Sequence, residues 1–215
     1  NVQPVDGLLC NAADFSANSI NDYITLNPSA MNGLSDFSVV IWGKSNSSQD
    51  SSILSGARDS SAQGTNEAVF YFDNNNEFWP SITSSPFDTG TQLGSTVNMN
   101  NGDWHQLVWT RKANTAQSCF YFDGVNQGCV THSDGDDNDA LQIASLILGQ
   151  EQDDFEGGFD LNQDWEGLLD ELIIFDSVLT TTQINDIKTN IEAGNNWNGS
   201  TRSCGSLPVA EYRFD

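Results

Sequence analysis

The chain has 215 residues, with 30 acidic against 7 basic side chains and a formal net charge of −23. This balance excludes nucleic acid as a partner, because phosphate binding needs clustered Lys and Arg. No apolar run is long enough to cross a membrane, and the polar start at Asn1 shows no signal peptide, so we expect mature or excised material. Only 17% of residues are charged, and the polar remainder of Asn, Ser, Thr and Gln is typical of extracellular β-proteins.

The first half of the chain contains short segments with the β-branched and aromatic composition of strands. Residues 1–12 are expected to be irregular, and residues 37–42 predict a central strand. Residues 67–73 and 77–83 predict a hairpin around three asparagines, a run that tolerates left-handed turns. Further strands or edge segments are predicted at residues 15–26, 53–57, 93–99 and 104–111.

Four cysteines suggest two disulfides. Cys119 and Cys129 flank a stretch centred on Gly124. A three-residue turn there would place residue 122 opposite 126, and hence 119 opposite 129. Facing residues of an antiparallel pair lie about 4.5 to 5.5 Å apart, within disulfide reach. Cys10 and Cys204 would then join the two ends of the domain, and the even count indicates an oxidising compartment.

The second half predicts two buried strands, at residues 141–148 and 168–175, and one helix. Thr180 and Gln183 have the spacing of a capping box, and isoleucines at helical spacing follow up to Gly194. Many short strands with one late helix indicate an all-β sandwich of two antiparallel sheets. We expect one domain over residues 1–194. The tail over residues 195–215 is linker-like and ends in a strand that completes this domain or begins another.

A loop dense in oxygen donors lies between the two buried strands, over residues 148–163. It offers five carboxylates and four side-chain amides, with no Lys or Arg to neutralise them. Such a set suits a hard cation with six to eight oxygen ligands, of which Ca²⁺ is the usual case. The alternative is a solvated acidic loop, which is common in a chain this acidic.

Three sets of residues together resemble the pentraxin and laminin-G-like branch of the concanavalin A-like jelly rolls. The order Leu148-Gly149-Gln150-Glu151-Gln152-Asp153 is very similar to the pentraxin calcium loop, and the match continues through Gly157, Phe159 and Gln163. Asp103-Trp104-His105 with Phe122-Asp123-Gly124 resembles a pair of strands of that family, and Phe175 to Leu179 resembles its entrance to the helix. The resemblance covers about residues 12–193 and implies a two-sheet jelly-roll fold with one short helix near the C-terminus.

The resemblance implies calcium ligands by position. They are the side chains of Glu151, Asp153, Asp160 and Gln163, with the backbone carbonyl of Gln152. The family adds an Asp-Asn pair from an earlier loop, where this chain has Thr65-Asn66, so Asn66 matches and the acid does not. Asp59 or Glu67 would substitute for it.

The family's core disulfide is absent, since its positions fall at about Val40 and Val108. We therefore expect a divergent, bacterial member. The last residues, 210–215, resemble the opening strand of laminin-G-like modules in large bacterial surface proteins.

Several other residues carry weaker signals. Tyr71 and Trp79 are placed to stack on a sugar or on choline methyl groups, although core packing is the alternative for each. The acidic run at residues 134–139 lacks the spacing of an EF-hand, so a solvated turn is expected. His105 and His132 have no nucleophile or carboxylate at an identifiable spacing. We expect His105 on a strand and His132 at the surface.

Enzymatic activity is not expected. Glycosidases that retain configuration need two carboxyl groups about 5 Å apart. The nearest candidates, Glu166, Asp170 and Glu171, lack the alternation along one strand that polysaccharide-cleaving members of this fold show, and the last two match a structural motif instead.

The leading hypothesis is therefore a calcium-dependent extracellular or cell-surface binding module, part of an adhesin, that recognises carbohydrate or a phosphorylated headgroup. The second is a structural spacer stiffened by Ca²⁺, and the third is a polysaccharide-active enzyme.

Overall fold

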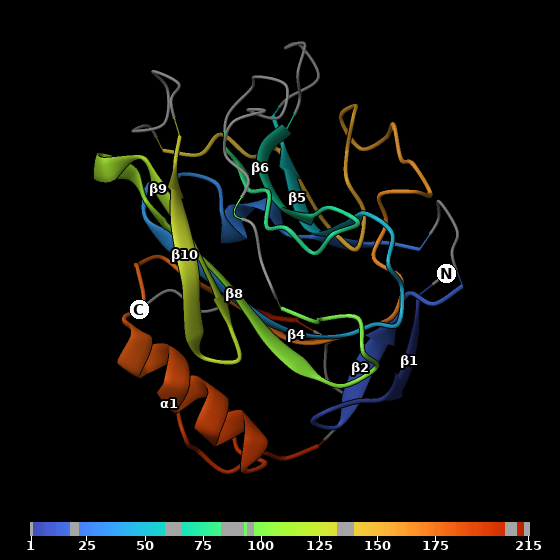
Figure 1. Cartoon of the computed structure of the whole chain (residues 1–215), viewed down its shortest axis with the longest axis vertical. Coiled ribbons are helices and arrows are strands. Elements are labelled where there is room, and N and C mark those ends of the chain that lie inside the picture. The colour runs from blue at the N-terminus through green and yellow to red at the C-terminus, as the bar shows by residue number, and fades with distance from the viewer. Residues whose placement is uncertain are drawn as a thin grey trace.

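Two sheets, antiparallel except where β13 joins β12, face each other across one core, and the α-helix of the described residues covers the outer face of the larger sheet (Figure 1). Two short 3-10 helices, η1 (Pro28–Ala30) and η2 (Ala113–Thr115), lie in connections. The computed structural model describes residues 2–17, 22–58, 66–82, 93, 97–132, 140–204 and 210–212, with the backbone alone at Asn66 and residues 210–212. This architecture confirms the predicted all-β sandwich with one helix late in the chain.

The larger sheet runs in the order β1-β2-β12-β4-β8-β9-β10, and β13 pairs with β12. Its strands are β1 (Gln3–Asp6), β2 (Asn11–Asp14), β4 (Phe37–Lys44), β8 (His105–Lys112), β9 (Gln117–Phe122), β10 (Val125–Thr131), β12 (Leu168–Phe175) and β13 (Ala210–Tyr212). β4 lies between β12 and β8 and is buried over nearly its whole length, as the central strand predicted at residues 37–42 should be.

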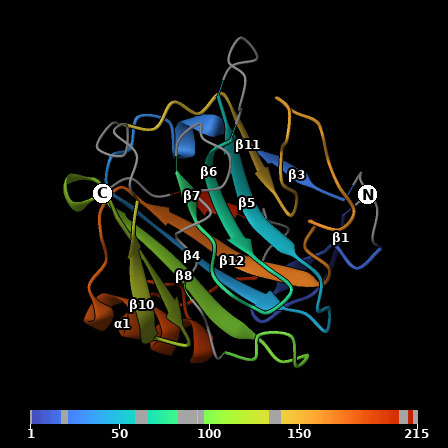
Figure 2. The same ribbon diagram turned by 45° about the horizontal axis from the view of Figure 1, so that its top comes forward.

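The smaller sheet runs in the order β3-β11-β5-β6-β7. Its strands are β3 (Ile24–Leu26), β5 (Ser51–Ala57), β6 (Asn66–Phe72), β7 (Ser81–Ile82) and β11 (Ser145–Leu148). They cross above the larger sheet in Figure 2. β11 leads directly into the acidic loop, so this sheet positions the candidate site.

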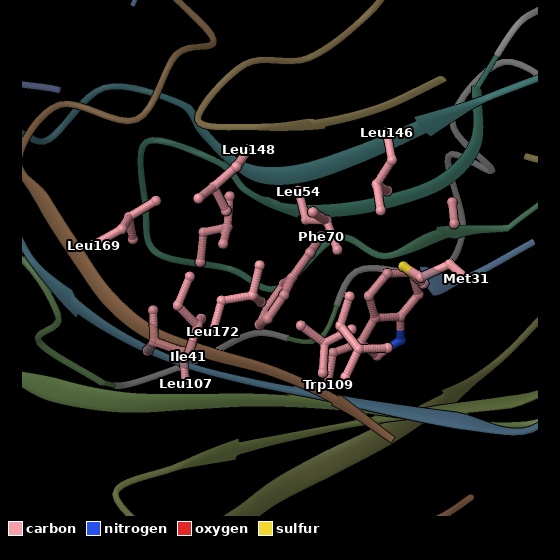
Figure 3. Packing of buried hydrophobic residues seen from close by; sticks show 14 of the residues in the cluster. Met31, Ile41, Leu54, Phe70, Leu107, Trp109, Leu146, Leu148, Leu169 and Leu172 are labelled. Atoms are coloured by element: carbon pink, nitrogen blue, oxygen red, sulfur yellow. The ribbon is translucent and has the colours of Figure 1, made fainter. Parts of the chain in front are cut away.

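Apolar side chains of the two sheets meet in the core. Leu54, Phe70 and Leu148 reach down from the smaller sheet toward Ile41 and Trp109 of the larger one (Figure 3). All five are at most 1% exposed. Successive side chains of a strand point to opposite faces, so the neighbouring residues of β4 and β8 face the helix instead.

The helix α1 (Thr181–Glu192) begins at the predicted capping box. The Thr180 side chain accepts from the Gln183 backbone, and the Gln183 side chain accepts from the Thr180 backbone. Ile184, Ile187 and Ile191 pack on Val40 and Trp42 of β4 in a second apolar cluster. The helix thus buries the outer face of the larger sheet (Figure 1).

The Cys119–Cys129 disulfide forms, but not through the predicted turn. Phe122 pairs with Val125, so the turn has two residues, Asp123 and Gly124, both in the left-handed region that two-residue hairpins favour. A bulge between Asn126 and Gly128 then restores the pairing of Cys119 with Cys129, whose Cα atoms lie 4.0 Å apart. The shorter turn shifts the register by one residue, and the bulge shifts it back by one. The predicted disulfide is therefore confirmed, although the predicted turn is wrong.

Two other predicted segments differ from the structure. Residues 1–12 were expected to be irregular, yet β1 and β2 form a hairpin in that region. Within residues 93–99, Leu93 makes one isolated bridge to Phe78, and residues 97–99 lie in no strand. Short polar strands such as β1 lack the apolar pattern on which strand prediction depends.

A disulfide, a strand pairing and an ion pair attach the tail to the sandwich. The predicted Cys10–Cys204 disulfide is present, and β13 pairs in parallel with residues 172–174 of β12. Beside them, Glu171 forms an ion pair with Arg202 at a bulge of β12. Asp170, 2% exposed, accepts from the backbone amides of Leu9 and Glu171 and so holds the turn between β1 and β2.

We predict that the two disulfides differ in their contribution to stability. The Cys10–Cys204 bridge spans 194 residues and the Cys119–Cys129 bridge spans 10. Loop-closure entropy then gives about 5 kcal/mol for the first and about 3 kcal/mol for the second. Urea unfolding of the two Cys→Ser double variants measures the difference, and an equal loss in both would contradict it.

Asp170 makes a pH-dependent contribution that is testable. Burial raises the pKa of this carboxyl to about 6. Because the folded chain holds the proton more tightly than the unfolded chain, the stability contributed by Asp170 falls as pH rises from about 4 to about 6. The advantage of the wild type over Asp170→Asn should shrink by about 2 kcal/mol between pH 4.5 and 7.5. A constant difference in urea unfolding would contradict this assignment.

Candidate functional site

The acidic loop leaves β11 at Gly149 and returns to β12 after Gly167. Backbone hydrogen bonds close its base, from Gly149 N to Ile53 O at 2.9 Å and from Trp165 N to Gly149 O at 3.0 Å. Gly149 has φ +89°, and a Cβ there would collide with the ring of Phe15. Only glycine satisfies both conditions, so the loop begins where the sequence match places a glycine.

The buried part of the loop holds Glu151 and Gln152, both 0% exposed. The Gln152 amide nitrogen donates to Ser55 O at 2.9 Å, and its amide oxygen accepts from Ser145 Oγ at 2.9 Å. The side chain of Gln152 is therefore committed to the smaller sheet. This leaves the backbone carbonyl as its means of reaching an ion, which is the role that the family resemblance assigns to it.

Gln163 lies on the other arm of the loop, close to β5 and β6. Its backbone carbonyl accepts from Ser52 N at 2.9 Å. Its side chain hydrogen-bonds Tyr71, whereas its amide oxygen Oε1 is buried without a hydrogen-bond partner. A buried amide oxygen without a donor is uncommon in a folded chain, and a cation would satisfy it.

Asp153 and Asp160 are exposed. Asp160 closes a local turn, since its Oδ1 accepts from Asn162 N at 2.9 Å and from Asn162 Nδ2 at 2.7 Å. The loop thus combines a buried carboxylate with two solvent-facing ones. This arrangement suits a cation that buried donors hold on its protein side and that stays open to water or ligand on its solvent side.

The residues expected from the earlier loop are only partly described by the structure. Asp59 and Thr65 lie outside the described residues, and Asn66 is placed by its backbone alone, at the start of β6. Glu67 is 0% exposed, forms an ion pair with Arg58 and accepts from Gln142 N at 2.7 Å. The carboxylate of Glu67 thus already has two partners, and its role as a calcium ligand stays a prediction.

Two acids near the loop were not predicted as part of the site from the sequence. Asp50, at the end of the β4–β5 connection, accepts from the Tyr71 hydroxyl at 2.7 Å. Asp164 is 0% exposed and accepts from Gln49 Nε2 at 2.7 Å, and burial raises its pKa to about 6. Each acid has its hydrogen-bond partner far away in sequence, so no local sequence pattern predicts either contact.

The two aromatic candidates differ in accessibility. Tyr71 is 3% exposed, and burial together with the Asp50 carboxylate raises the pKa of its hydroxyl. Trp79 is half-buried, and its ring lies 6.3 Å from that of Tyr71 in an edge-on arrangement. Of the pair, Trp79 is the more accessible side chain.

The described residues contain no group of three His, Cys, Asp or Glu side chains arranged to hold a metal. The oxygen donors of the loop nevertheless fit Ca²⁺, which takes amide and backbone oxygens as readily as carboxylates. Glu151, Gln163 and the Gln152 carbonyl would form the inner side of the site, and Asp153 and Asp160 the outer side.

The histidines and the other acids have structural roles. His105 Nδ1 lies 2.8 Å from Asp123 Oδ2, a carboxylate that the sequence did not indicate. His132 was expected at the surface, but it is 8% exposed, with Nε2 2.8 Å from Ser118 Oγ. The residues 134–139 lie outside the described part of the chain. Asp170 and Glu171 are engaged in the backbone and ion-pair contacts given above.

Comparison with known proteins decides the family. The model of the Pentaxin family matches residues 11–198. The chain belongs to the pentaxin family. This confirms the resemblance seen in the calcium-loop residues.

Curated relatives of this pentaxin align over a short segment. C-reactive protein of Mesocricetus auratus is 50% identical over 44 residues, which are 20% of this chain and 20% of that protein. The chain therefore matches about a fifth of the length of such relatives.

Solved structures share the fold at low identity. A native heptameric SAP-like pentraxin from Limulus polyphemus has a TM-score of 0.62 at 18% identity, covering 77% of this chain and 75% of that one. Domain 4 of an extracellular arabinanase from Geobacillus stearothermophilus, in complex with arabinotriose, has a TM-score of 0.60 at 21% identity, covering 86% and 80%. Domains LG4-5 of the mouse laminin α1 chain have a TM-score of 0.60 at 14% identity, covering 84% and 46%. These likenesses establish the jelly-roll fold.

We predict that Ca²⁺ stabilises this pentaxin. At a Ca²⁺ concentration of about 100 times Kd, ligation adds roughly 2.7 kcal/mol, or about 5 to 10 °C in melting temperature for a chain of this size. Glu151→Gln should abolish the shift, and Asp160→Asn should reduce it. Asp176→Asn changes an exposed acid outside the loop and serves as the control. Equal shifts in all three variants would remove Glu151 and Asp160 from the site.

Proposed function

We propose that this pentaxin is a calcium-dependent extracellular binding module that recognises carbohydrate or a phosphorylated headgroup. The observation that carries the proposal is that one acidic loop holds a fully buried carboxylate, Glu151, and the buried amide oxygen of Gln163, and that both residues interact with Tyr71. A hard cation between them would be held from the protein side by buried donors.

The open side of such an ion would be the place where a ligand binds. Asp153 and Asp160 are exposed, so they can share the outer coordination positions with water or ligand. Vicinal hydroxyl groups of a sugar, or phosphate oxygens, replace water readily at an under-coordinated Ca²⁺. The half-buried Trp79 ring lies next to Tyr71, where it offers an apolar surface to a sugar ring or to choline methyls.

The surroundings support an extracellular location. All four cysteines are in disulfides, which persist in oxidising compartments. The described residues contain no helix long and apolar enough to cross a membrane. We place the module at a cell surface as part of an adhesin, with the arabinotriose complex of the arabinanase domain as precedent for glycan binding by this fold.

A structural spacer stiffened by Ca²⁺ is the second candidate function. The deep burial of Glu151 and Gln152 favours it, because an ion there ties β11 to β12 whether or not a ligand is present. An enzymatic role has no comparable support, since Asp170 and Glu171 already serve structural contacts.

A glycan array that includes phosphorylated headgroups, probed with Ca²⁺ and with chelator, tests the proposal. We expect binding that needs Ca²⁺ and that falls about tenfold or more in Trp79→Ala, as for a stacking contact of roughly 1.5 kcal/mol. Trp197→Ala, which changes a ring beneath α1 away from the loop, is the control. Calcium-dependent stability without any bound ligand would favour the spacer, and binding in chelator would exclude the proposed mechanism.

A further inference from the structure

A calcium ligand that is an amide must present its oxygen, and the two ends of an amide have nearly the same shape. Gln163 would offer Oε1 to the ion, but rotation by half a turn would bring its NH₂ group forward instead. An NH₂ group carries hydrogens and repels a cation, so some contact has to select the orientation. For Gln152 the question does not arise, because its side chain is bound to Ser55 and Ser145.

The contact that selects it lies at Tyr71. The Tyr71 hydroxyl donates its proton to Asp50 Oδ2 at 2.7 Å. A hydroxyl that donates to one partner is left with only acceptor positions for others. The Gln163 side chain also hydrogen-bonds this hydroxyl. Gln163 must therefore approach it with its NH₂ group, which leaves Oε1 as the buried oxygen without a partner.

Asp50 in turn is fixed from the other side. Its Oδ1 accepts from the backbone amide of Asn74 at 2.7 Å, at the turn that follows β6. Tyr71 is 3% exposed, so its ring cannot swing away to water. The chain of contacts from Asn74 through Asp50 and Tyr71 thus ends at the Gln163 amide.

We propose that Asp50 and Tyr71 form a positioning relay that orients the Gln163 amide so that its oxygen faces the calcium ion. The inference rests on the proposed calcium site and adds two residues that touch neither the ion nor the ligand. It also moves Tyr71 from the ligand-contacting role suggested by its sequence position to a supporting one. The relay joins β6, the β4–β5 connection and the acidic loop. The orientation of the Gln163 amide therefore depends on how these three segments are placed relative to one another.

Calcium titration by calorimetry tests the relay. Tyr71→Phe removes the hydroxyl and leaves the ring in place, and we expect Ca²⁺ affinity to fall about tenfold, the lower end for a lost supporting contact. Asp50→Asn should weaken affinity in the wild type but add less than about twofold in the Tyr71→Phe background, because it acts through Tyr71. Tyr121→Phe, beneath α1, is the matched control.

A change at Gln163 itself separates positioning from packing. A carboxylate presents an oxygen in either orientation, so in the Gln163→Glu background Tyr71→Phe should cost less than about twofold in Ca²⁺ affinity. A tenfold loss in both backgrounds would show that Tyr71 only packs, and would overturn the relay. An Asp50→Asn loss that persists without the Tyr71 hydroxyl would make Asp50 a direct ligand and overturn it as well.

The outcomes also separate this inference from the proposed function. A wild type that shows no heat of Ca²⁺ binding removes the calcium site and the relay together. A wild type that binds Ca²⁺, with Tyr71→Phe unchanged, removes the relay alone. In chelator, each variant should keep a single cooperative melting transition well above the titration temperature, which excludes a general loss of folding as the cause.

Discussion

Burial of the Glu151 carboxylate is the constraint on which the acidic loop depends. Placing a charged group away from water is costly unless an opposite charge or several hydrogen-bond donors replace the solvent. The residues 148–166 include seven acids and no Lys or Arg. Under the proposed function a divalent cation would add positive charge among these acids, and the oxygens of Gln163 and Gln152 have the chemistry to complete its coordination.

The sandwich supplies the rigidity that such a loop needs. Gly149 packs against Phe15 at the start of the loop, and Trp165 returns to Gly149 through a backbone hydrogen bond. Between these points the side chain of Gln152 is fixed to the smaller sheet, and Gln163 is fixed by β5 and by Tyr71. The ion would therefore bind to donors that are already held in place, which lowers the entropy cost of forming the site.

The outer face of the larger sheet is covered by the helix rather than by the smaller sheet. There α1 covers Val40 and Trp42, and the tail is held by the Cys10–Cys204 bridge and by β13. The bridge and the strand pairing join the tail to the sandwich. The candidate binding chemistry lies at the loop between β11 and β12.

Sequence alone determined those features that depend on neighbours along the chain. The order of glycines, amides and acids in the loop, the capping box of α1 and the strand at residues 168–175 each reside in one continuous stretch, where periodicity and residue type carry the information. The Cys119–Cys129 pairing was also predicted, although its turn was not, because a bulge compensated the wrong register.

Only the tertiary structure decided which distant side chains meet. Asp50 reaches Tyr71 across 21 residues, and Glu67 pairs with Arg58. His132, polar and expected at the surface, is buried against Ser118. Hydrogen bonds and ion pairs of this kind depend on how two sheets are packed, and a linear pattern contains no record of that packing, because the partners become neighbours only when the chain folds.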